Sequence, residues 1–380
     1  MSRSHAPARG QRTGFTTGAC AAAAARAATS GLIQGMLPTH VETLLPNGQR
    51  VGFPVAAGQV TGEWAEAVVI KDAGDDPDCT HGAHLTARVR PLPTGAGQVV
   101  ILGGKGIGVV TRPGLGLPLQ QAAINPVPRR NIAENVRAVA GEWLTHTGLE
   151  LVLSIPDGAA LARRTLNPRL GILGGLSILG TSGIVHPYST AAFRAAMQQS
   201  IRAAAAQGVN TLVLTTGRRS ERFAMAQRPD LPAHAFVQMG DFVGAALTQV
   251  AQVGIPALLI AAMVGKLAKM GQGLANTHAR KGAIDMAWIA QLARQVGAPE
   301  PICQQIRLGV TVRHATERLA ECGLDEALVR ALVDHAARAL IPRLPTTTRL
   351  ALLAFDFAGN VLADWPETPS RGALQDQSDD

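Results

Sequence analysis

Aromatic side chains are scarce in this chain: Phe, Trp and Tyr together make up 3% of 380 residues. Proteins that bind single strands without sequence preference stack the bases on such rings, so we expect no nucleic-acid partner. Cysteine is also rare. The four thiols are widely spaced and form no C-x-x-C pair, which argues against a disulfide framework and a zinc knuckle. We therefore expect no bound metal.

Long apolar runs are missing as well. The longest, at 255–264, ends before Lys266 and is shorter than the roughly 20 residues of a membrane-spanning helix. No basic segment followed by an apolar one opens the chain, so no secretory signal is expected. Charged residues make up 16% and hydrophobic residues 47%, which is typical of a globular protein. We expect a cytoplasmic protein with no membrane partner, and nothing in the sequence specifies an oligomeric state.

The charged residues are predominantly basic. Basic residues outnumber acidic ones by 35 to 27, for a formal charge of +8, and nearly all of them are arginine. The planar guanidinium pairs with carboxylates and phosphates. Either an anionic ligand or the composition of a GC-rich genome accounts for the excess.

Two patterns of secondary structure divide the chain. Residues 12–188 carry an alanine-rich helix capped by Thr17, a hairpin turn at 46–48, several alternating strands and a helix capped by Asn131, which predicts an α+β domain. Residues 189–365 alternate helices with short apolar strands, which predicts an α/β domain with a small parallel sheet. The polar ends, 1–11 and 366–380, are expected to be disordered tails.

A glycine-rich apolar segment, GILGGLSILGTSGIVHPYS, occupies 171–189. Glycine allows another group to approach the main chain closely. The segment is either a buried crossing between two halves, with amides facing a ligand, or an ordinary packed junction. The candidate ligand-contacting residues are Thr181, Ser182 and Gly183 in this segment and Asn167 just before it.

Acidic residues crowd the segment KDAGDDPDCTHGAH that begins at Lys71. Carboxylates this dense either bind a hard cation or raise the pKa of one of their number, making it a base. Asp75 and Asp76 are the candidates for such a catalytic role. The alternative is a solvated turn rich in Asp, Gly and Pro.

A loop rich in Gly and Pro, 103–118, is followed by AINPVPRRN. Its G-x-G does not lie between a strand and a helix, and it lacks the G-K-[ST] of a P-loop. Arg112 and Arg129 are placed to present guanidiniums to carboxylates. The alternative is a surface loop with ordinary charges.

The predicted strand ends of the second half carry polar residues. Ligands of open α/β sheets bind at the carboxyl ends of strands, which makes a nucleoside site plausible there; its candidates are Thr216, Gly217, Glu221, Gly240 and Asp241. Asp241 is equally well explained as a helix cap.

The cationic segment 265–282 also follows a strand end. We interpret it as a loop in which Lys266 binds an acidic substrate. His278 is either a residue that moves a proton near neutral pH or a structural histidine.

Six motifs in one order make the sequence resemble the cobalt-precorrin-5B C1-methyltransferase (CbiD) family. They are GFTTGACAAAAARAA, KDAGDDPDCTHGA, VTRPGLGLP with AINPVPR, GILGGLSILGTSGIVHPYS, TTGRRSE and QMGDFVG. The resemblance runs from about residue 12 to 365. Phe15, Cys79 and the ending His-Pro-Tyr at 186–188 depart mildly from the family pattern.

The resemblance implies methyl transfer from S-adenosylmethionine to C1 of a cobalt-containing polycarboxylate ring, giving cobalt-precorrin-6A. It implies a first domain similar to a permuted α+β fold of a ribosomal protein. Orientation rather than a strong base is expected to dominate the catalysis. Asp241 is assigned to the ribose, because a carboxylate at the sulfonium would stabilise the ground state.

Substrate carboxylates are assigned to Arg112, Arg129, Arg218 and Lys266. The acids at 72–78 would repel such a substrate, so they either shape their loop or lie on the cofactor side. Two other functions stay open: a non-enzymatic tetrapyrrole carrier, and a nucleotide-dependent transferase.

Overall fold

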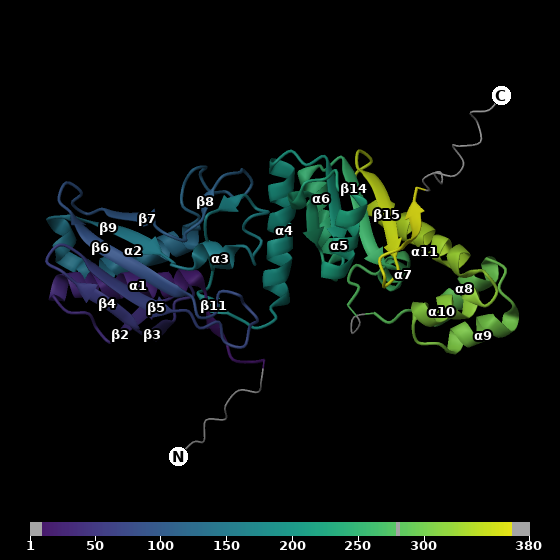
Figure 1. The fold of residues 1–380 in the computed structure, drawn as a ribbon, viewed down its shortest axis with the longest axis horizontal. Coiled ribbons are helices and arrows are strands. Elements are labelled where there is room, and N and C mark those ends of the chain that lie inside the picture. Colours follow the sequence, from purple (N-terminus) through teal and green to yellow (C-terminus); the bar gives the residue numbers. More distant parts are fainter. Residues whose placement is uncertain (1–9, 279–281, 367–380) are drawn as a thin grey trace, which may run out of the picture. The chain divides into compact units, whose positions relative to one another are not determined.

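The protein is described by a computed structural model, which covers residues 10–278 and 282–366 (Figure 1). Its contacts divide the chain into two compact units, Met1–Thr190 and Ala191–Asp380. The domain boundaries expected at 12–188 and 189–365 stay predictions, and the expected tails fall almost entirely outside the described residues. In the described ranges, no helix is long and apolar enough to cross a membrane.

The first unit is built on a five-stranded sheet of order β4-β5-β6-β9-β7. Its pairs are antiparallel except β7 with β9. The hairpin predicted at 46–48 joins β2 to β3 in antiparallel register. The strands span β2 His40–Leu44, β3 Arg50–Pro54, β4 Ala57–Val60, β5 Ala65–Ile70, β6 His84–Leu92, β7 Val99–Gly103 and β9 Gly148–Ser154.

Helix α1 (Thr17–Gln34) packs against β5, β6 and helix α2 (Pro126–Ala140). Its alanines at 19, 21–25, 27 and 28 are almost completely buried, because a side chain no larger than a methyl group lets a helix approach its neighbours closely. The predicted caps are wrong. The N-cap of α1 is Thr16, not Thr17: its hydroxyl accepts a hydrogen bond from the amide of Ala19 (3.2 Å). Asn131 lies inside α2, and its side-chain amide donates to the Leu44 carbonyl (2.9 Å).

The glycine-rich segment belongs wholly to the first unit, so it is not a crossing between halves. It contains β10 (Ile172–Leu173), which pairs with β8 (Val109–Val110), and β11 (Ile184–Val185), which pairs with β1 (Gly14–Phe15). The amide of Leu179 donates to the Thr17 hydroxyl (3.0 Å). Short helices at Gly141–Thr145 (η1) and Gly158–Ala162 (α3) complete the unit.

The second unit contains a sheet of order β13-β12-β14-β15-β16. The first four strands are parallel, which confirms the pairing predicted from alternating helices and strands; β16 is antiparallel and was not predicted. The strands span β12 Thr211–Thr215, β13 Phe236–Gln238, β14 Ala257–Met263, β15 Arg349–Phe355 and β16 Val361–Trp365.

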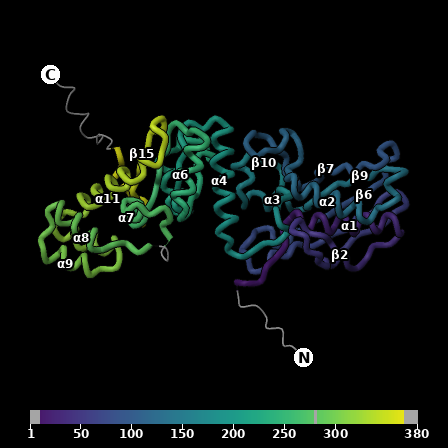
Figure 2. The backbone as a smooth tube through the Cα atoms, turned by 180° about the vertical axis from the view of Figure 1, so that it is seen from behind, coloured from purple at the N-terminus to yellow at the C-terminus, as the bar shows by residue number. Residues whose placement is uncertain are grey.

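Two sets of helices accompany this sheet (Figures 1 and 2). Helix α4 Thr190–Ala206 precedes the first strand, and the connections that follow carry α5 Arg218–Gln227, η2 Ala233–Ala235, α6 Val243–Val253 and α7 Val264–Gly271. A helical cluster with its own core follows in α8 Met286–Gln295, α9 Glu300–Leu308, α10 Val312–Ala320, α11 Asp325–Leu340 and η3 Ile341–Arg343. The cationic segment at 265–282 is therefore helical at its start, contrary to the loop predicted there.

Candidate functional site at the carboxyl edge of the parallel sheet

Three strands of the second unit end in polar residues at one edge of the sheet. Parallel strands place their carboxyl ends together. Thr216 and Gly217 follow β12, Gly240 and Asp241 follow β13, and Lys266 lies in the first turn of α7 after β14.

Asp241 is the centre of a hydrogen-bonded cluster at this edge. Its Oδ1 accepts from the Lys266 ammonium and from the Thr277 hydroxyl (3.0 Å). Lys266 also donates to the carbonyl of Thr277 (3.1 Å), as does Lys269 (3.2 Å). The cluster joins the end of β13 to α7 and to the segment that follows it.

Electrostatics favour the charged form of Asp241. Burial raises the pKa of this carboxyl, but the hydrogen bond and charge of Lys266 outweigh burial, and its pKa lies below the usual value. Burial lowers the pKa of Lys269, and the charge of Lys266 lowers it further. The edge therefore holds an ionised aspartate whose charge is matched by an adjacent ammonium.

The end of β12 leaves its main chain open to approach. The Ser220 hydroxyl accepts from the amide of Thr216 (3.1 Å) and donates to the carbonyl of Gly217 (3.0 Å), which fixes the turn into α5. A Cβ built on Gly217 or on Gly265 would meet nothing within 4 Å. Among the described residues, no other atom therefore covers the main chain closely at these two glycines.

Glu221 is buried behind this turn and accepts from the side chain of Gln238 (2.8 Å). Gly240 adopts φ 57°, and a Cβ there would lie 3.0 Å from the ring of Phe193. The two residues therefore shape the end of β13. Among the predicted residues at this edge, Arg218 begins α5 with an exposed side chain.

His278 is exposed, and its amide donates to the side chain of Asn276 (3.0 Å). Thr277, Lys269, Ser220 and Gln238 were not predicted as site residues. Thr277 and Lys269 fall within the cationic segment, so its density of polar groups was a usable signal. Gln238 is the first residue of the motif QMGDFVG, but its contact with Glu221 depends on the pairing of β13 with β12.

The predicted residues of the first unit mainly hold that unit together. Arg129 donates to the carbonyl of Ile101 (3.0 Å), and the β-carbon of Arg112 lies close to Gly171. The Ser182 hydroxyl accepts from the amide of Ile184 (3.2 Å).

The rest of the glycine-rich segment is bound in the same way. The carbonyl of Gly183 accepts from Thr16, and Thr181 lies between Gly180 and Ser182 in the same turn. Asn167 donates to the carbonyl of Gly175 (3.1 Å) and accepts from Ser177 (3.2 Å).

The acidic side chains of the segment that begins at Lys71 form hydrogen bonds and ion pairs with other residues of the first unit. Asp75 accepts from the amides of residues 10–12, including the last two of the expected tail (2.8–3.1 Å). Asp72 pairs with Arg12, and Asp76 accepts from the amide of Tyr188 (3.0 Å). Hydrogen bonds from the amides of Arg12 and Gly10 lower the pKa of Asp75. These contacts favour a role in shaping the loop over one as a base of raised pKa.

The fourth acid, Asp78, bonds to the completely buried Lys71 (2.6 Å). Its other oxygen accepts from the amide and the hydroxyl of Thr80 (2.8 and 2.7 Å). Across residues 10–278 and 282–366, no group of three or more His, Cys, Asp or Glu is arranged to hold a metal ion.

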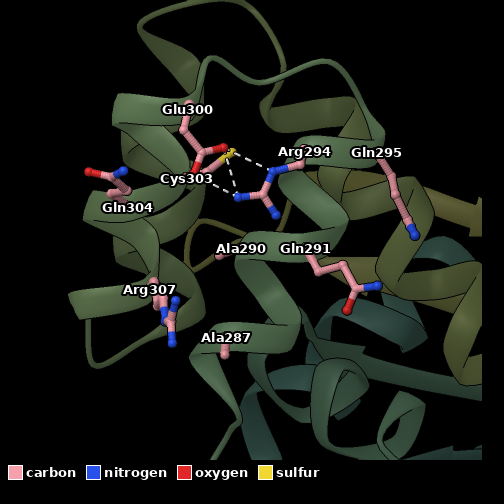
Figure 3. Close-up of a pocket in the computed structure, with 9 residues that line it drawn as sticks. All are labelled: Ala287, Ala290, Gln291, Arg294, Gln295, Glu300, Cys303, Gln304 and Arg307. Atoms are coloured by element: carbon pink, nitrogen blue, oxygen red, sulfur yellow. Dashed lines mark hydrogen bonds and ion pairs between the residues drawn. The ribbon is translucent and has the colours of Figure 1, made fainter.

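A pocket of about 680 Å³ lies between α8 and α9 (Figure 3). It contains none of the predicted residues. The guanidinium of Arg294 makes bonds of 2.7–2.9 Å to Glu300, and Cys303 donates to the carbonyl of Ala298 (3.5 Å). The central charges of the pocket are thus paired with each other, which makes it a weaker candidate than the strand edge.

A parallel sheet with an aspartate and lysines at its carboxyl edge is the arrangement at which open α/β proteins bind small ligands. The CbiD family model matches residues 4–187, and the model for the CbiD C-terminal domain matches 276–366. The chain belongs to the CbiD family.

Curated relatives extend this likeness over nearly the whole chain. A cobalt-precorrin-5B C(1)-methyltransferase of Dechloromonas aromatica is 56% identical over 93% of this chain and 91% of its own. One of Methylococcus capsulatus is 54% identical over 96% of both. A crystal structure of the cobalamin biosynthesis protein cbiD of Archaeoglobus fulgidus is 27% identical, with a TM-score of 0.38 over 68% of this chain and 79% of that one.

Proposed function

We propose that this protein methylates C1 of cobalt-precorrin-5B, with S-adenosylmethionine as the methyl donor, to give cobalt-precorrin-6A in the cytoplasm. Family membership and the names of relatives at more than 50% identity support the reaction. The observation that carries the location is the Asp241–Lys266–Thr277 cluster at the edge of the parallel sheet. We further propose that 12–188 and 189–365 are separate domains, the first with the permuted α+β fold.

The residues at this edge fit the methyl donor. Asp241 uses Oδ1 for Lys266 and Thr277, so its second oxygen is the acceptor for a ribose hydroxyl. The main chain at Gly217 and Gly265 is open to a nucleoside passing over the strand ends. When bound, S-adenosylmethionine supplies an electrophilic methyl group on sulfur.

Charge matching explains why an aspartate is tolerated here. Methyl transfer removes the positive charge of the sulfonium, so an uncompensated carboxylate nearby would stabilise the ground state more than the transition state. Lys266 compensates Asp241. We therefore propose Lys266 as the counter-ion of Asp241 rather than as a contact of the substrate.

With Lys266 assigned to Asp241, the proposed contacts of the substrate carboxylates are arginines. Arg218, at the first turn of α5, is exposed at the same edge. Arg112 and Arg129 remain candidates in the first unit, together with the turn at 181–183. Binding by guanidiniums orients the ring for transfer, and orientation is worth several powers of ten in rate.

The test is incubation of the purified protein with cobalt-precorrin-5B and S-adenosylmethionine, followed by mass spectrometry. The expected result is the gain of one methyl group and formation of S-adenosylhomocysteine. Binding of the corrinoid without a change of mass would identify a carrier instead. Arg218→Ala should weaken corrinoid binding in a salt-dependent way, whereas Arg330→Ala on α11 is the matched surface control.

A further inference from the structure

An exposed aromatic ring flanked by two guanidiniums lies at the carboxyl end of β15. The ring of Phe357 is 60% exposed. The guanidinium carbon of Arg219 lies over it, 5.5 Å from the centroid, and that of Arg313 lies 5.6 Å from it. We call these three residues the Phe357 platform. Both distances are within the range of cation–π attraction.

The platform is held by its surroundings. Asp356 accepts from the amides of Ala358, Gly359 and Asn360 (2.8, 2.6 and 2.9 Å), which locks the turn between β15 and β16. A Cβ on Gly359 would lie 2.6 Å from the ring of Phe223 in α5, so this turn rests directly on that helix. The backbone that carries the exposed ring is therefore held in place.

The cations of the platform come from two different helices. Arg219 lies in the first turn of α5 and makes no hydrogen bond or ion pair to other residues of the described ranges. Arg313, on α10, is oriented by an ion pair of its Nε with Glu317 (2.8 Å). The contact is exposed and is worth only about 0.5–1 kcal/mol, and it leaves the guanidinium of Arg219 accessible to an anion.

The platform lies at the same edge as the proposed methyl-donor site. β15 pairs in parallel with β14, so the turn after β15 is at the carboxyl edge, and Arg219 follows the end of β12 directly after Arg218. A flat conjugated ligand that carries carboxylates matches both components: its rim stacks on the phenyl ring, and its carboxylates pair with the guanidiniums.

The geometry points to the Phe357 platform as a binding site for the macrocycle, in which Arg219 and Arg313 bind carboxylate side chains of the cobalt corrinoid and Phe357 contacts the rim of the ring. This inference rests on the proposed function, since it names where that substrate binds. It adds Arg313 and Phe357, which lie in none of the sequence motifs, and Arg219, which lies in TTGRRSE but was not a candidate residue.

The test measures binding of cobyrinic acid, a cobalt corrin with free carboxylates, to the full-length protein by isothermal titration calorimetry. Its fully esterified form is the uncharged control ligand. Arg219→Ala is expected to raise Kd about tenfold, the loss of one charge-assisted pair, and Phe357→Leu about threefold. Arg349→Ala, at an exposed arginine at the start of β15 and thus at the opposite edge of the sheet, should leave Kd unchanged. The ester should bind equally to the three proteins that keep Phe357, and about threefold more weakly to Phe357→Leu.

Parallel methyl-transfer assays separate this inference from the proposed function. If the wild type transfers methyl groups and the Arg219 and Phe357 variants bind cobyrinic acid as it does, the platform is not the site and the function stands. If the wild type transfers none but Arg219→Ala still weakens binding, the platform stands and the function falls. If a variant lowers only the melting temperature, the platform is a structural contact and the inference is overturned.

Discussion

Replacing Asp78 by Asn tests the buried ion pair of the first unit. Lys71 is 1% exposed and is held by Asp78 at 2.6 Å. The asparagine keeps an oxygen to accept from Thr80 but removes the charge. The Lys71 ammonium then stays buried without a counter-ion, which costs about 3–5 kcal/mol for a fully buried pair. Asp78 is 26% exposed, so we expect the lower end, about 3 kcal/mol.

The assay is differential scanning calorimetry of the full-length protein. For a unit of this size, about 3 kcal/mol corresponds to a fall of roughly 6–12 °C in melting temperature. The double variant Lys71→Met with Asp78→Asn removes both charges and should return to within about 1 kcal/mol of the wild type. A single variant as stable as the wild type, or a double variant no better than the single, would refute the reasoning.

The same pair predicts a pH dependence. Burial raises the pKa of Asp78, but the hydrogen bond and charge of Lys71 bring it below its ordinary value of 3.8. A lowered folded-state pKa means that the stabilisation is complete above the unfolded value and is lost as pH falls through the folded one. The difference between wild type and Asp78→Asn should therefore be full at neutral pH and shrink below about pH 4.

Other parts of the chain give three more predictions. Asp241→Asn should raise Kd for S-adenosylhomocysteine about tenfold by calorimetry; an unchanged Kd would remove this residue from the nucleoside site. Gly175→Ala would place a Cβ 2.1 Å from a main-chain carbonyl oxygen and should cost about 1–3 kcal/mol in urea unfolding, whereas Gly52→Ala, which meets nothing, should not. Burial raises the pKa of Cys20 to about 12, so a thiol reagent should label exposed Cys322 and spare Cys20 in the native protein; labelling of both would contradict this burial.

The sequence predicted best those structural features that depend on residues close together in the chain. Alternation of helices and apolar strands is a short-range pattern, and it predicted the parallel pairing of β12, β14 and β15. Strand β16 was missed because its register depends on a turn fixed by Asp356. The start of α2 was placed five residues late, at Asn131, because the two prolines at its start were interpreted as part of a loop.

The candidate site at the strand ends was predicted by the same logic and stays a prediction. Strand ends marked Thr216, Gly217 and Asp241, because any parallel sheet collects them at one edge. The pairing of Lys266 with Asp241 could not be predicted from the sequence, because it depends on the path of α7 and of the segment that follows it. The acids at 72–78 appeared chemically active as a group, yet each has its own partner within the first unit.

Helix α1 constrains how this protein can vary. Its alanines are buried on every side, between the sheet and α2, so the spacing of these layers is set by single methyl groups. An added methylene would have to push two layers apart, while a glycine would loosen the helix itself. In a saturation scan of the whole chain, we expect this stretch of the smallest apolar side chains to tolerate fewer substitutions than the large leucines and isoleucines of the same core.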